Sequence, residues 1–272
     1  MPDPTARTFR YHSVAKVLEG SLVLPLQQKI PTQGHAFLDE DGGYRAQHST
    51  GYRVEGILSF SEGHSQVAGN LSTKPEGGWC TLNTTVIKDL SVLEILTADK
   101  VVGQIITNHP ANGDVPTVSF LGTRYENLRI AGYPVELKMN LDILGDKPAN
   151  DASYTEDSGV LSRVSKQHES FRQAGSLPAE AAERYNQQIA RRRSAEVIEC
   201  SIVDQAFGQY PGYSHGNHIW VPEFGLITLG KLTVSLDSKR RTTVELTMIG
   251  LKLGCAIHAE VEIGSSGCNG VG

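Results

Sequence analysis

The stretch that decides the fold is Thr84–Leu144, TTVIKDLSVLEILTADKVVGQIITNHPANGDVPTVSFLGTRYENLRIAGYPVELKMNLDIL. It is rich in β-branched and aromatic residues, and glycine, proline or asparagine interrupts it at short intervals. Such runs predict consecutive β-strands joined by tight turns. Its last part, Pro134–Leu144, alternates apolar and polar residues, which predicts a strand with one buried and one exposed face.

A second β-rich run, Ile219–Ile263, follows near the C-terminus and alternates in the same way. Its apolar residues change phase once: Val244, Leu246 and Met248 come before the change, and Ile249, Leu251 and Leu253 come after it. A slip of one residue turns the apolar side chains to the other face of a strand. The sequence therefore predicts a β-bulge or a bend between Met248 and Gly250.

The segment between these two β-rich halves has a helical pattern. Over Val160–Gly175 the residues on one helical face are Leu161, Val164, His168 and Phe171. A second helix is expected between Ser176 and Arg193, with Pro178 near its start. The fold prediction is one mainly β domain over residues 1–272, an antiparallel β-sandwich or a large open barrel, with a helical insertion at about 152–194.

Composition excludes several classes of protein. The 272 residues are 39% hydrophobic and 20% charged, which is typical of a globular chain. A net charge of -5 gives no general attraction to nucleic acid, and no apolar run is long enough to span a membrane. The four cysteines are scattered and form no CxxC motif, which favours thiols over the alternative of one or two disulfides.

Motifs for known chemistry are absent or lie in the wrong context. Gly212–Gly216 matches GxSxG, but a nucleophile elbow needs a helix after the serine, and a strand-like segment follows here. The chain has no P-loop, no dinucleotide-binding fingerprint and no HExxH motif. The sequence therefore identifies no catalytic residues and leaves open whether the chain is an enzyme, and it predicts no cofactor and no metal.

The irregular region Phe207–Gly225 is the best place to look for a binding site, because functional residues concentrate in loops on a rigid scaffold. The candidate residues are Tyr210, Tyr213, His215, His218, Trp220 and Glu223. In one strand His215 and His218 would lie on opposite faces, so joint metal binding would need an irregular loop. Further along the chain, His258, Glu260 and Glu262 share one strand face, which is interpreted as a solvated face of a sheet.

Three segments together resemble a known family: TTVIKDLSVLEILTADKVVGQI (84–105), RYENLRIAGYPVELKMN (124–140) and FGLITLGKLTV (224–234). The helical segment SYTEDSGVLSRVSKQHESFR (153–172) fits the same resemblance. The family is that of the β-rich bacterial surface proteins labelled choice-of-anchor. The resemblance implies a place at the cell surface and no active-site residues. The N-terminus, by contrast, shows no signal peptide, which favours the cytoplasm.

Three functions remain open at this stage. The first is a non-catalytic structural or binding protein that self-associates into homo-oligomers through its strand edges. The second is a small-molecule carrier or a β-barrel enzyme, such as an isomerase, cyclase or hydrolase, with an apolar cavity between its sheets. The third is a carbohydrate-binding module that uses Tyr210, Tyr213 and Trp220.

Overall fold

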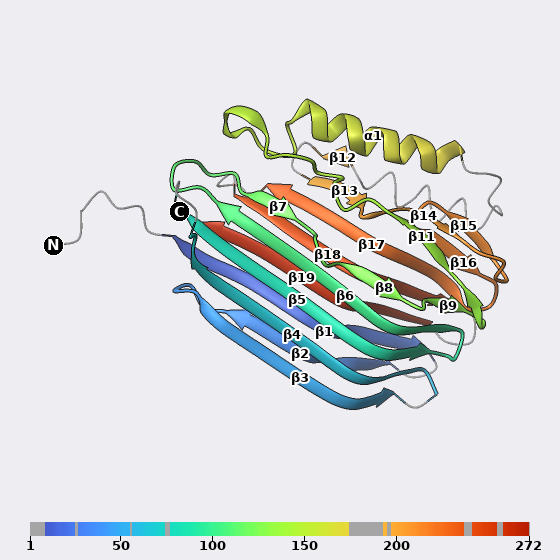
Figure 1. Cartoon of the computed structure of the whole chain (residues 1–272). Coiled ribbons are helices and arrows are strands. Elements are labelled where there is room, and N and C mark those ends of the chain that lie inside the picture. The colour runs from blue at the N-terminus through green and yellow to red at the C-terminus, as the bar shows by residue number, and fades with distance from the viewer. Residues whose placement is uncertain are drawn as a thin grey trace.

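The computed structural model describes residues 9–24, 27–54, 56–73, 77–173, 193–194, 197–236, 241–254 and 258–271. It is a two-layer β-sandwich with one long helix at its side (Figure 1). Every pairing between its strands is antiparallel. The mainly β fold and the sandwich are therefore confirmed. The two sheets stack face to face and do not close into a barrel.

Sheet A contains the first two strands and the last three long strands of the chain. In spatial order it consists of β12 (Arg193–Ser194), β13 (Val197–Ser201), β17 (Gly225–Leu236), β18 (Thr242–Gly254), β19 (His258–Val271), β1 (Arg10–Leu24) and β2 (Gln28–Leu38). The hairpin β15 (Tyr213–His215) and β16 (His218–Val221) joins this sheet beside β17. The N-terminal strand thus lies directly beside the C-terminal one, with Arg10 opposite Val271.

Sheet B is built largely from the stretch Thr84–Leu144 and from the two strands before it. Its order is β10 (Tyr133–Pro134), β9 (Arg129–Ile130), β6 (Leu96–His109), β5 (Trp79–Val92), β4 (Leu58–Leu71) and β3 (Gly43–Val54). Two short strands, β7 (Thr117–Ser119) and β8 (Arg124–Glu126), also pair with β6. The prediction of consecutive strands is confirmed here.

The predicted strand over Pro134–Leu144 is only partly correct. Strand β11 covers Glu136–Met139 and pairs with β14 (Val203–Phe207) in a small third sheet, and the chain turns at Leu141–Leu144. Ile143 and Leu144 are buried in that turn. The alternation therefore continues past the strand because the turn itself packs against the core.

The helical insertion contains a short 3-10 helix, Ala149–Asp151, and the long helix α1, Ser158–Gln173. Asp157 caps α1, since its Oδ1 accepts a hydrogen bond from the Val160 amide at 2.8 Å. Gln167 fastens the helix to sheet A by bonding both the carbonyl and the amide of Ser201. The predicted second helix lies largely outside the described residues. Arg193 and Ser194 form a strand, so the helical insertion does not extend to 194.

One row of residues runs across sheet A and changes its shape. The row consists of Gly230, Met248, Gly264, Val17 and Gly34, one from each of β17, β18, β19, β1 and β2. Its three glycines have positive φ values of 57°, 67° and 52°, a backbone conformation that favours glycine. We call this row the crease. It confirms the bend predicted near Met248, and the strand register continues through it unchanged between β17, β18 and β19.

The crease turns toward sheet B, where it meets two glycines. A methyl group added to Gly63 would lie 2.6 Å from Val17, and one added to Gly103 would lie 2.8 Å from Met248. The Ser65 hydroxyl donates to the Gly34 carbonyl at 2.6 Å, and the Tyr125 hydroxyl donates to the Met248 carbonyl at 2.6 Å. The two sheets therefore touch closely along the crease, and the outer face of sheet A is correspondingly hollowed.

Candidate functional site

The candidate site is a polar groove on the outer face of sheet A, directly over the crease. In a regular strand every second side chain points outward. At the crease the outward side chains are three residues apart, as in Lys16 and Glu19 on β1 or Ser265 and Glu262 on β19. The backbone between them is left uncovered by side chains. A furrow therefore crosses the strands instead of following them.

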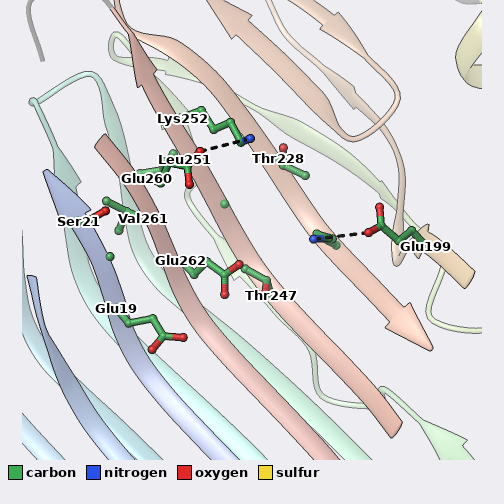
Figure 2. Close-up of a pocket in the computed structure, with 13 residues that line it drawn as sticks. Glu19, Ser21, Glu199, Thr228, Thr247, Leu251, Lys252, Glu260, Val261 and Glu262 are labelled. Atoms are coloured by element: carbon green, nitrogen blue, oxygen red, sulfur yellow. Dashed lines mark ion pairs between the residues drawn. The ribbon is translucent and has the colours of Figure 1, made fainter. Parts of the chain in front are cut away.

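Two adjoining depressions make up the groove, with volumes of about 420 Å³ and 440 Å³. They share Glu19, Thr247 and Glu262, which lie beside the crease on β1, β18 and β19. Figure 2 shows Glu262 and Thr247 close together at the centre of the first depression, with Glu19 beyond them. The site is thus assembled from strands that are far apart in the sequence.

The charged groups of the groove are five glutamates and three lysines: Glu19, Glu199, Glu245, Glu260 and Glu262, with Lys16, Lys231 and Lys252. Each lysine lies near a glutamate. The Nζ–Oε distance is 2.8 Å for Lys16–Glu19. It is 3.9 Å for Lys231–Glu199 and 3.4 Å for Lys252–Glu260, the two ion pairs that dashed lines mark in Figure 2.

Glu245 and Glu262 have no lysine partner among the described residues, so the groove keeps a negative excess. Glu262 accepts a hydrogen bond from the Ser265 hydroxyl at 3.2 Å. It also lies directly opposite Glu19, and like charges in this arrangement repel one another. A ligand group that donates hydrogen bonds or carries positive charge would relieve this repulsion.

Aromatic side chains lie on the same face on both sides of the groove. Phe37 on β2 is 43% exposed and lies opposite Val14 on β1. Val14 lines the second depression, so Phe37 lies on the same face of the sheet. The ring of His12, which also lines this depression, meets Phe37 edge-on at a centroid distance of 5.5 Å. Phe37 and His12 thus form one aromatic border of the groove.

The second aromatic border includes two residues that the sequence singled out. Trp220 lies opposite Leu226, and Leu226 lies opposite Lys252 in the groove. Residues directly opposite each other on neighbouring strands share a face, so Trp220 is on the groove side of sheet A. Tyr213 lies opposite Trp220 on the outermost strand and is 49% exposed. Two of the sequence candidates, Trp220 and Tyr213, therefore lie at one end of the groove, and their part in binding stays a prediction.

The arrangement of His215 and His218 differs from the one expected from the sequence. The expected loop between them is a two-residue turn, Gly216–Asn217, so the two histidines face each other across the β15–β16 hairpin on one side of it. Both are buried, and the His218 Nδ1 is 3.0 Å from the Thr228 hydroxyl, which lines the groove. The described residues include no group of three or more His, Cys, Asp and Glu side chains that could hold a metal ion.

The remaining two candidates lie away from the groove. Tyr210 is 7% exposed and packs in the core, where burial raises the pKa of its phenol. Glu223 is exposed in the turn between β16 and β17 with a φ of 61°. The predictions of Tyr210 and Glu223 as binding residues assumed that the whole irregular segment Phe207–Gly225 lies on one surface. Its residues in fact divide between the core, a turn and the face of the sheet.

Sequence reasoning missed the centre of the site, which is Glu19, Thr247 and Glu262. Glu262 was interpreted only as part of a solvated face, because a single strand does not show which strands flank it. The available signal was the slip at Met248–Gly250. It marks the crease in one strand, but it does not show that the same irregularity crosses the four neighbouring strands.

Comparisons with known proteins identify a family but no activity. The sequence model of a domain of unknown function (DUF8256) matches residues 9–235. No curated protein and no solved structure matches the chain. The resemblance to choice-of-anchor surface proteins stays a prediction. In the part of the chain that the structure describes, no helix is long and apolar enough to cross a membrane.

Proposed function

We propose that this chain, which belongs to the DUF8256 family, is a non-catalytic binding protein that holds an extended carbohydrate across the outer face of sheet A. The observation that carries the proposal is the groove over the crease. It crosses β17, β18, β19 and β1, has hydroxyl, carboxylate and ammonium groups along its length, and is bordered by aromatic side chains, of which Phe37 and Tyr213 are exposed.

The spacing of these groups suits a chain of sugar rings better than a compact ligand. The span from β2 to β16 covers six neighbouring strands, or about 24 Å at the usual strand separation. Serine and threonine hydroxyls both donate and accept hydrogen bonds, as sugar hydroxyls do. The aromatic borders at Phe37 and Trp220 offer flat apolar surfaces for the faces of terminal rings.

The excess of negative charge in the groove restricts the kinds of sugar that are expected to bind. Glu245 and Glu262 favour neutral or amino-substituted sugars and disfavour sugars that carry carboxylate or sulfate groups, because like charges repel in a shared groove. The alternative of a carrier with an apolar cavity between the sheets gains no support from these depressions. They are polar and lie on the outside of sheet A.

The test is isothermal titration calorimetry with neutral, amino-substituted and acidic oligosaccharides. We expect binding of the first two kinds, weakened about tenfold by Trp220→Ala or Phe37→Ala, since covering about 60 Å² of apolar surface at about 25 cal/mol per Å² contributes about 1.5 kcal/mol. Tyr133→Ala is the matched control, because Tyr133 is 49% exposed on β10 in sheet B. Binding that is equally sensitive to Tyr133→Ala, or no binding at all, would refute the proposal.

A further inference from the structure

The two outermost long strands of the sandwich differ in how their free edges are protected. Within the described residues β2 pairs only with β1, and β3 pairs only with β4. Strand β2 contains Pro31, a left-handed Gly34 and an irregular register with β1. These are features that prevent a strand edge from pairing with another chain. Strand β3 contains no proline and keeps a continuous register with β4 from Gly43 to Thr50.

The regular part of β3 is bounded by two glycines at equal distances from its centre. Gly43 has a φ of 96° and Gly51 has a φ of 62°, so the extended backbone between them is Tyr44–Thr50. The midpoint of this segment is Gln47, which is exposed. An unpaired strand of this kind exposes a row of amide and carbonyl groups that another strand can bind.

We propose that β3 pairs with β3 of a second copy of this chain, antiparallel and about a twofold axis through Gln47, to form a homodimer. A twofold axis at this position places each residue opposite one at the same distance on the other side of Gln47. Tyr44 then faces Thr50, Arg45 faces Ser49 and Ala46 faces His48, while Gln47 faces its own copy. Alternate residues of a strand direct their backbone N–H and C=O groups to the same edge. In every pair both residues are even-numbered or both are odd-numbered, so the outward backbone groups of the two strands meet.

These pairs fit together in size and in charge. An aromatic residue opposite a β-branched residue, as in Tyr44 with Thr50, is a favourable cross-strand pair. Arg45 is the only arginine or lysine in the segment, it forms an ion pair with Asp39, and its counterpart Ser49 is neutral. Two facing glutamine amides can each donate to and accept from the other. The segment is thus complementary to itself, which favours a second copy over an unrelated partner.

The interface is small, since seven residues of each copy pair, so the dimer is expected to be weak and concentration-dependent. Sedimentation velocity on the full chain at rising concentration should show a monomer passing into a dimer. Gln47→Lys and Gln47→Glu place like charges opposite each other at the axis. Each variant alone should weaken association by about fivefold or more at low salt. An equimolar mixture of the two variants should restore it, because opposite charges then meet.

Controls separate this interface from others and from misfolding. Gln28→Lys and Gln28→Glu introduce the same charges at an exposed position of β2 and should leave association as in the wild type. Far-ultraviolet circular dichroism should be unchanged in all four variants, since both positions are exposed. A wild type that is monomeric at every concentration, or a mixture that fails to restore the dimer, overturns the proposal. A β3 edge that binds extended acidic peptides but not a second copy of the chain overturns the proposal as well.

Discussion

The interior of the sandwich has two unlike regions, one on each side of the crease. On one side sheet B contributes large aliphatic and aromatic side chains, including Leu58, Phe60, Ile87, Leu90 and Leu96. On the other side it contributes Ser65, Thr81, Asn83, Thr85 and Thr107, all at most 1% exposed. Apolar packing dominates the first region. In the second region, hydrogen bonds within and between the sheets add to the packing of apolar residues such as Val67, Val244 and Leu246.

Several buried groups of the polar region have partners within the sandwich, although the buried Ser266 hydroxyl on β19 has no hydrogen-bond partner among the described residues. The Ser13 hydroxyl on β1 donates to the Asn83 Oδ1 on β5, and the Asn83 Nδ2 donates to the Gly267 carbonyl on β19 at 2.7 Å. The hydroxyls of Thr81 and Thr107 are hydrogen-bonded to each other. A buried polar group without a partner is costly. The polar half of the core therefore depends on exact partners as well as on packing, while the apolar half depends on packed volume alone.

The largest expected effect lies in the apolar region. Leu90→Ala should lower the free energy of unfolding by about 2–5 kcal/mol, because it removes buried methyl groups and leaves a cavity. Leu90 is 2% exposed. Urea unfolding followed by circular dichroism measures the loss. Leu71→Ala, at a position that is 73% exposed, is the control and should change little. A loss at Leu90 no greater than at Leu71 would contradict the assignment of an apolar core to this region.

A somewhat smaller loss is expected in the polar region. Asn83→Leu keeps the branching and the number of side-chain heavy atoms but leaves the Ser13 hydroxyl and the Gly267 carbonyl without their partner, which should cost about 2–3 kcal/mol. In the same urea assay, the double variant Ser13→Ala with Asn83→Leu should cost less than the sum of the two single changes, because the residues are coupled. An Asn83→Leu protein that is more stable than the wild type would show that the two regions do not differ in kind.

The polar region should also respond to alkaline pH through Cys268. Burial raises the pKa of this thiol from an ordinary 9.0 to about 12. The unfolded chain therefore loses the proton first, so the thiol's contribution to stability is complete below pH 9 and declines as the pH rises toward 12. Denaturant unfolding across this range should show a shallower decline for Cys268→Ala than for the wild type. Parallel curves would exclude this role for Cys268.

The smallest effect is expected outside the core, in the groove. Glu262→Gln removes a like charge opposite Glu19, so it should raise the free energy of unfolding by at most about 0.5 kcal/mol. The same variant should alter the binding of amino-substituted sugars measured by calorimetry. A large loss of stability would instead mean that Glu262 supports the fold.

The sequence was sufficient for the class of fold and for the position of the first helix, because strand alternation and helical periodicity are local patterns. It was not sufficient for the packing face of that helix, since Leu161 is 40% exposed and Val160 is buried in its place. It was insufficient for the pairing of β1 with β19, which depends on residues at the two ends of the chain. The sequence favours free thiols, and Cys80, Cys200 and Cys268 form no disulfide with one another. Cys255 lies outside the described residues.

The site was harder to predict than the fold for a specific reason. Trp220 and Tyr213 were identified because exposed aromatic residues stand out in a glycine-rich segment. Glu19 and Glu262 are 243 positions apart and look like ordinary solvated residues until the strand order is known. A groove made by the same irregularity in five strands has no signature in any one of them.

The pairing of β1 with β19 also bears on how the protein reaches its folded state. These strands lie at the centre of sheet A, with β18 on one side and β2 on the other. Contacts between residues so distant in the chain slow folding, because the long intervening loop must close before they form. During synthesis β1 therefore cannot complete its pairing until β19 has left the ribosome. Until then β1 presents an unpaired strand edge and an uncovered apolar face that a chaperone or a neighbouring nascent chain can bind.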